Sequence, residues 1–270
     1  MEYDPIKAKL GVLFNSTTFF RKTFYKLLDL LLLRAWHVHK DLRIWMAKNK
    51  GKKAEILDAG CGFGQYSYYL AKNHPEYNIL AVDVMEKQIA DCSQFFKKAG
   101  LNNVTFRIED LVTYVKPNSY DLIVSVDVME HILEDVQVFK NFYASLKPGG
   151  MLIVNTPSDQ GGSDVKEEGQ ESFIGEHVRD GYNIEEIQEK LRSVGFKTID
   201  ARYTYGKPGK ISWKLSMKYP MLMLNKSMAF GVLLPFYYAI TYPVSYVLNS
   251  LDVSGKHPTG TGLVVKAWKQ

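Results

Sequence analysis

The chain has few cysteines for its length: Cys61 and Cys92 are the only two among 270 residues. Two cysteines cannot build the disulfide framework of a small secreted domain, and their scarcity is typical of a reducing compartment. Residues 1–5 also lack the basic and apolar regions with which a secretory signal peptide begins. We therefore expect a cytoplasmic protein, and we interpret Cys61 as a small packing residue rather than a nucleophile.

Acidic residues are scarce in two segments that flank an acidic centre. Residues 1–53 hold 12 Lys/Arg against 4 Asp/Glu, and residues 207–257 hold 6 Lys against 1 Asp. Residues 54–206 hold 14 basic against 24 acidic side chains. Both basic segments are also rich in apolar residues. This combination favours an anionic membrane surface or a lipid-like ligand over nucleic acid.

Charge is absent over 25 positions, residues 227–251. The length would suffice to cross a bilayer, but Pro235 and Pro243 would kink such a helix and several polar side chains dilute it. A core-packing helical cap is one interpretation. An apolar cap over a lipophilic substrate, in contact with the membrane interface, is the other.

A glycine-rich loop is the most informative feature that is present. The apolar segment 54–58 ends at Asp58 and runs into Gly60-Cys61-Gly62-Phe63-Gly64, after which a helix is predicted. Glycine lets the backbone turn tightly and approach a ligand closely, and the helix N-terminus offers free N–H groups. A strand, glycine loop and helix in this order are typical of a nucleotide site. The spacing differs from the Gly-x-Gly-x-x-Gly of dinucleotide enzymes.

Strand and helix patterns alternate after this loop, which predicts a mostly parallel sheet with helices on both faces. Helices are expected near 65–73, 86–99, 134–146 and 183–194. Strands are expected at 54–58, 78–83, 104–108, 120–126, 151–155, 196–205 and 261–268.

Acidic side chains close several of these strands: Asp83 ends the second, Glu109 and Asp110 follow the third, and Asp127 follows the fourth. The ordered set resembles the class I S-adenosylmethionine-dependent methyltransferases over roughly residues 54–206 and the last strand. The resemblance implies an α/β, Rossmann-like, seven-stranded sheet whose last strand is antiparallel. It also implies three parts: an N-terminal helical cap (1–53), a donor-binding core (54–206 and 258–270) and an apolar, basic insertion near the active site (207–257).

The same resemblance implies S-adenosyl-L-methionine as the cofactor and assigns its contacts. The glycine loop would hold the methionine portion, with Asp58 fixing the loop amides, and Asp83 would accept the ribose hydroxyls. Adenine would pack on apolar neighbours and meet Asp110 through its amino group. The residues expected at the cofactor are Asp58, Gly60, Cys61, Gly62, Gly64, Asp83, Val84, Met85, Asp110, Leu111 and Val126.

Three hypotheses for the catalytic group remain open. Asp127, Glu130 and His131 follow the fourth strand, and His177 comes later, an order similar to the Glu-x-x-Glu-His pattern of metal-using methyltransferases. A divalent metal held by Asp127, Glu130, His131 and His177 is the first hypothesis. The second makes His131 or His177 a general base without a metal. The third gives these residues a structural role only. Trp36, His37 and His39 either line the site or pack in the interior.

We interpret the protein as a methyltransferase for a lipophilic, hydroxylated or aromatic small molecule, with oxygen favoured over carbon as the acceptor atom. Its further partner would be an anionic membrane surface. The alternatives are an RNA 2′-O-methyltransferase, which the apolar character of the basic segments disfavours, and a non-catalytic, membrane-associated nucleotide-binding protein. The sequence carries no indication of an oligomeric state.

Overall fold

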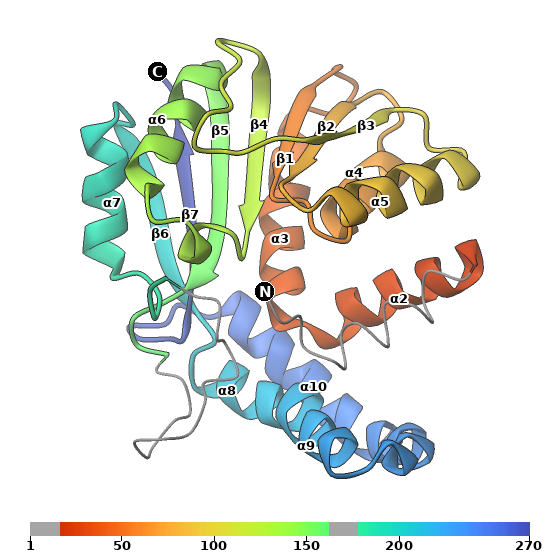
Figure 1. Cartoon of the computed structure of the whole chain (residues 1–270). Helices are drawn as coiled ribbons and strands as arrows, with labels where there is room; N and C mark the ends of the chain where they lie inside the picture. The colour runs from red at the N-terminus through yellow and green to blue at the C-terminus, as the bar shows by residue number, and fades with distance from the viewer. Residues whose placement is uncertain (1–16, 162–177) are drawn as a thin grey trace.

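A seven-stranded sheet organises the chain in the computed structural model, which describes residues 17–161 and 178–270 (Figure 1). The strands are β1 (Glu55–Ala59), β2 (Asn78–Asp83), β3 (Val104–Ile108), β4 (Tyr120–Val126), β5 (Leu146–Pro157), β6 (Thr198–Thr204) and β7 (Gly262–Trp268). Their order in the sheet is β3-β2-β1-β4-β5-β7-β6. β7 lies between β5 and β6 and pairs antiparallel with both, while the other pairs are parallel. The predicted fold class is thereby confirmed.

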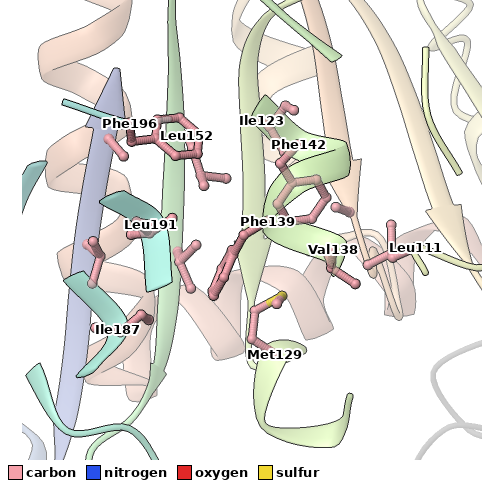
Figure 2. Packing of buried hydrophobic residues seen from close by; sticks show 14 of the residues in the cluster. Leu111, Ile123, Met129, Val138, Phe139, Phe142, Leu152, Ile187, Leu191 and Phe196 are labelled. Carbon is pink, nitrogen blue, oxygen red and sulfur yellow. The ribbon is translucent and has the colours of Figure 1, made fainter. Parts of the chain in front are cut away.

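Two hydrophobic cores lie on opposite faces of this sheet because successive strand side chains point to opposite sides. Leu57 and Ile123 belong to the core under α6 and α7, whereas Ile56 and Leu122 belong to the core under α3, α4 and α5. Figure 2 shows the first core, in which α6 contributes Phe139. The covering helices are α3 (Leu33–Lys48), α4 (Gln65–Asn73), α5 (Glu86–Lys98), α6 (Asp135–Ser145) and α7 (Ile184–Ser193).

The remaining helices gather beyond the carboxyl edge of the sheet, where β1, β2 and β4 end (Figure 1). One of them, α2 (Thr18–Leu31), precedes α3. The segment between β6 and β7 supplies the others, α8 (Lys207–Trp213), the π-helical η2 (Lys214–Lys218), α9 (Tyr219–Lys226), the 3-10 turn η3 (Met228–Val232) and α10 (Leu234–Ser254). Since ligands bind at this edge in open α/β sheets, these helices surround the candidate site.

Two details differ from the sequence expectations. β5 starts at Leu146 instead of residue 151, because Leu146 pairs with Tyr120 before a register shift in the ladder. α10 is one helix of 21 residues: Pro235 lies in its first turn, where its missing N–H is not needed, and Pro243 lies inside it. Over residues 17–161 and 178–270, no helix has both the length and the hydropathy for crossing a bilayer.

Candidate active site

The glycine loop joins β1 to α4 through left-handed backbone. Gly60, Gly62 and Gly64 have φ values of +77°, +49° and +75°, a region that favours glycine. A Cβ on Gly60 would lie 2.3 Å from Cγ2 of Val128, so this position also lacks room. A Cβ on Gly62 would meet only Gln88 Oε1, at 3.8 Å. The backbone at Gly62 is therefore open to a ligand that passes along the loop.

Asp83 fixes the loop in this shape from the end of β2. Its Oδ2 accepts the N–H of Gly62 at 2.9 Å, and its Oδ1 accepts the N–H of Met85 at 2.9 Å. Each carboxylate oxygen keeps a further lone pair, so the side chain can still accept two hydroxyl groups. The ribose role predicted for Asp83 is compatible with this geometry.

Asp58 makes a different contact from the one we expected. The structure gives its Oδ2 a hydrogen bond from the Ser67 hydroxyl at 2.6 Å, which ties the end of β1 to the first turn of α4. Complete burial raises the pKa of Asp58 to about 6. The loop amide at Gly62 belongs to Asp83 instead, so Asp58 orients the helix that follows the loop.

An apolar surface lies open next to Asp83. The side chains of Val84 and Ile108, at the ends of β2 and β3, are 60% and 52% exposed, whereas Met85 and Val126 are half-buried. Exposed aliphatic side chains beside a polar acceptor suit a planar, apolar base linked to a sugar. Leu111 is buried in the core, so only part of the predicted apolar set faces outward.

Asp110 caps the turn that follows β3. Its Oδ1 accepts the N–H of Val112 at 2.9 Å, and its backbone carbonyl accepts the N–H of Tyr114 at 2.7 Å. The side chain remains exposed, so its second carboxylate oxygen can reach a ligand. Capping and contact with an amino group are therefore compatible roles for this residue.

The two cysteines are packing residues. Cys61 and Cys92 are buried, and burial raises the pKa of both thiols, that of Cys92 to about 12. The Cys92 thiol lies 3.5 Å from the carbonyl oxygen of Gly62 and 3.4 Å from Arg21 Nη2. Because a thiol in such surroundings stays protonated, neither cysteine is suited to nucleophilic attack.

Helix α2 holds the other side of the loop, a contact that the sequence did not reveal. Arg21 and Tyr25 are buried, and both donate hydrogen bonds to the carbonyl oxygen of Phe63, Arg21 through Nη2 at 2.9 Å. Gln65 Nε2, at the start of α4, donates to Asp29 Oδ1 at 2.7 Å. In the sequence, the only signal of this contact was the four-residue spacing of Arg21 and Tyr25, which puts both side chains on one face of a helix.

A polar cluster lies beside the end of β4. Arg34 of α3 forms an ion pair with Asp127, and the Arg34 backbone N–H donates to the Tyr205 hydroxyl at 3.0 Å. The Tyr66 hydroxyl and Arg34 Nε are buried and have no hydrogen-bond partner within the described part of the chain. Burial raises the pKa of Tyr66, and the nearby Arg34 charge opposes this rise in part. Arg34, Tyr66 and Tyr205 were not predicted as site residues.

The proposed metal ligands do not converge among the described residues. Asp127 is paired with Arg34, while Glu130 is buried and accepts the Thr156 hydroxyl at 3.1 Å. Burial raises the pKa of Glu130. His131 is exposed on the 3-10 turn η1 (Met129–His131), and His177 lies outside the described residues. In the described ranges no three His, Cys, Asp or Glu side chains gather, so the metal site stays a prediction without a contact to support it.

His37 and His39 of α3 are buried, whereas Trp36 is half-buried and packs at the surface. His37 Nε2 lies 2.8 Å from Asp252 Oδ1, a buried pair that joins α3 to α10. The His39 ring stacks on Tyr69 at 3.8 Å, and Trp36 meets the edge of Tyr246. The packing interpretation therefore accounts for all three side chains.

Two surface hollows lie away from the loop. One, of about 270 Å³, is at the amino edge of the sheet beside Glu55 and Asn78. The other, of about 310 Å³, lies between α2, α3 and α10 beside Trp36 and Arg43. Neither is lined by the glycine loop or Asp83, so neither is the donor site.

Comparison with known proteins identifies the family. A family model described as "Methyltransferase domain" matches residues 50–202. A phosphoethanolamine N-methyltransferase of Triticum aestivum is 27% identical over 150 residues, 54% of this chain and 28% of that protein. A ubiquinone biosynthesis O-methyltransferase of Rickettsia felis is 33% identical over 110 residues, 40% of this chain and 43% of that protein. The chain thus spans less than half the length of these curated relatives.

Solved structures show the same fold. A putative sarcosine dimethylglycine methyltransferase from Galdieria sulphuraria has a TM-score of 0.59 at 18% identity, covering 87% of this chain and 85% of that one. Phosphoethanolamine N-methyltransferase 2 from Haemonchus contortus, in complex with S-adenosyl-L-methionine, also scores 0.59 at 20% identity, covering 86% and 52%. The chain belongs to the class I S-adenosylmethionine-dependent methyltransferases, an enzyme family whose cofactor is S-adenosyl-L-methionine.

Proposed function

We propose that the protein methylates a lipophilic, hydroxylated or aromatic small molecule, using S-adenosylmethionine as the methyl donor. Oxygen is favoured over carbon as the acceptor atom. The observation that carries this proposal is the polar cluster of Arg34, Tyr66, Asp127 and Tyr205 next to the glycine loop. Two of its donors are buried without a partner among the described residues, a costly state that a bound polar group would relieve.

The donor would lie along the carboxyl edge. The Gly62 backbone offers room for its methionine portion, Asp83 accepts the ribose hydroxyls, and Val84 contacts the adenine. S-adenosylmethionine supplies a methyl group already activated by its sulfonium. The protein therefore has to hold the acceptor in line with that methyl group and remove the acceptor's proton.

Arg34 and Tyr66 would hold the acceptor. Arg34 Nε can only donate a hydrogen bond, and the Tyr66 hydroxyl can donate or accept, so a ligand oxygen satisfies both. The ubiquinone biosynthesis O-methyltransferase relative supports oxygen as the acceptor atom. The phosphoethanolamine N-methyltransferase relatives make nitrogen the alternative.

His131 is the candidate base within the described residues. It lies on η1 directly after β4, at the same edge as Asp127. His131→Ala should abolish turnover and leave the affinity for S-adenosylhomocysteine unchanged, the pattern expected of a group that acts on the acceptor. Full turnover in this variant would transfer the role to His177, for which His177→Ala is the matching test.

A labelled-donor assay tests the function itself. The protein is incubated with methyl-labelled S-adenosylmethionine and a lipid extract, RNA, or neither. We expect label only in the organic phase of the lipid arm. Label in RNA would favour the RNA methyltransferase interpretation. Donor binding without transfer in any arm would favour a non-catalytic nucleotide-binding protein.

A further inference from the structure

Helix α10 buries polar residues and exposes apolar ones, the reverse of the usual arrangement in a helix that faces water. Its buried residues are polar: Ser245, Asn249 and Asp252. Large aliphatic and aromatic residues recur every three or four positions on the exposed side, which makes one continuous face. This outer face consists of Phe236 (70% exposed), Ile240 (77%), Val244 (51%), Val247 (56%) and Leu251 (54%).

The polar inner face fixes this orientation through hydrogen bonds. The Ser212 hydroxyl of α8 donates to Asn249 Oδ1 at 2.6 Å. Asp252 accepts the backbone N–H groups of Gly209 at 3.0 Å and Tyr205 at 3.1 Å, in addition to its contact with His37. Rotating α10 to bury its aliphatic face would break these bonds and leave the N–H groups of Gly209 and Tyr205 without their acceptor. The apolar side therefore has to face outward.

The charged side chains that residues 207–257 expose have one sign. Asp252 is the only acid in 207–257 and is fully buried. The six basic residues of the same segment are exposed or half-exposed: Lys207, Lys210, Lys214, Lys218, Lys226 and Lys256. A segment that exposes aliphatic side chains and lysines, and no acid, is complementary to anionic headgroups above an acyl layer.

Helix α2 also exposes large apolar side chains. Its inner face buries Arg21 and Tyr25, while Phe19, which is 72% exposed, and Leu30 lie outside with Lys22 and other polar neighbours. Both α2 and α10 lie beyond the carboxyl edge of the sheet (Figure 1). A second apolar and basic helix on this side increases the area available to the same partner.

We infer that the outer face of α10, supported by α2, docks onto the surface of an anionic lipid bilayer. α10 lies in the plane of the interface and does not cross the membrane, in agreement with the hydropathy of the described helices. A second copy of the chain fits less well, because the exposed charges of residues 207–257 are all lysines and the same segment of a second copy offers them no opposite charge. The inference does not depend on the identity of the acceptor.

Vesicle binding tests this surface. The full chain is sedimented with phosphatidylcholine vesicles, with or without phosphatidylserine, at low and high salt. We expect binding to the anionic vesicles that salt weakens but does not abolish, since apolar burial persists when charges are screened. The double variant Ile240→Glu/Val247→Glu should bind at least about tenfold more weakly, or more than ~1.4 kcal/mol.

The matched control places the same charges outside α2 and α10. Val115 and Val136 are exposed valines outside α2 and α10, so Val115→Glu/Val136→Glu should bind vesicles like the wild type. Both double variants must keep their circular dichroism and their affinity for S-adenosylhomocysteine. Equal vesicle binding by both double variants would overturn the inference. So would a wild-type dimer that dissociates when α10 is charged.

A site-specific probe keeps the inference testable if the charged variant misfolds. Both native cysteines are buried, so Ile240→Cys provides one accessible thiol for an environment-sensitive dye. Anionic vesicles should shift the emission of the labelled protein to the blue, while the dye on Val136→Cys should not respond. An unchanged emission at position 240, with the protein bound to vesicles, would show that another surface makes the contact.

Discussion

Removing the Asp83 carboxylate separates a donor-binding role from a structural one. Asp83→Ala deletes the acceptor of two loop N–H groups, those of Gly62 and Met85. Hydrogen bonds to a charged group contribute about 1.5–3 kcal/mol each when buried, and these are partly exposed, so we expect a loss of about 1–2 kcal/mol in the free energy of unfolding. Loss of the ribose contacts should weaken S-adenosylhomocysteine binding by more than tenfold, or ~1.4 kcal/mol, in titration calorimetry.

Asp121 offers a matched control at the opposite edge of the sheet. Its Oδ2 accepts the backbone N–H of Glu55 at 2.8 Å and the Lys147 ammonium at 2.7 Å. Asp121→Ala should therefore destabilise the fold by a similar amount and leave the donor affinity unchanged. If the two variants lose the same affinity, or if Asp83→Ala loses none, the assignment of the donor site is refuted.

The other predictions address the loop, the interior and the metal. Gly60→Ala, whose new Cβ clashes with Val128, should lower the free energy of unfolding in urea by about 2–4 kcal/mol. Adding Val128→Ala should recover part of this loss. An unchanged free energy of unfolding in Gly60→Ala would contradict the packing at this position. Gly62→Ala has room beside Gln88 and should cost only about 1–2 kcal/mol while weakening S-adenosylhomocysteine by more than tenfold; unchanged affinity would remove the loop from the site. Burial lowers the pKa of His39 to about 4, so at this residue the unfolded chain binds more protons between pH 4 and 6.5 and the His39 contribution to stability should rise with pH there, by up to about 3 kcal/mol. Asp58, whose pKa burial raises to about 6, contributes in the opposite direction, so the comparison with a variant isolates the histidine. His39→Phe should flatten this rise, and equal slopes in both proteins would refute the assignment. Turnover should survive a chelator and gain nothing from added magnesium, manganese or zinc; dependence on a metal would restore the metal hypothesis.

Local sequence patterns were sufficient for the strands and the glycine loop that frame the expected donor site. β2 and β4 have the predicted bounds, Asn78–Asp83 and Tyr120–Val126, because buried parallel strands are apolar runs with sharp polar ends. The left-handed backbone of the loop follows directly from its glycines. The partner of Asp58 was not predictable in this way, since the choice between the loop amides and Ser67 depends on the position of α4.

The proposed acceptor site depends on tertiary contacts that no local pattern records. Arg34 and Asp127 are distant in the chain and meet only because α3 crosses the carboxyl edge of the sheet. Composition showed that 227–251 is apolar but not which face of the helix points outward. That orientation is set by the partners of Asn249 and Asp252 on α8. Pro243 lies inside α10, which continues through it.

A crystal structure with S-adenosylhomocysteine tests the central claim most directly. The account predicts the ribose hydroxyls within hydrogen-bond distance of Asp83, the homocysteine portion along the backbone at Gly62, and the sulfur directed toward Arg34 and Tyr66. A ligand bound in either surface hollow, or one that leaves Asp83 without a ribose contact, would contradict it.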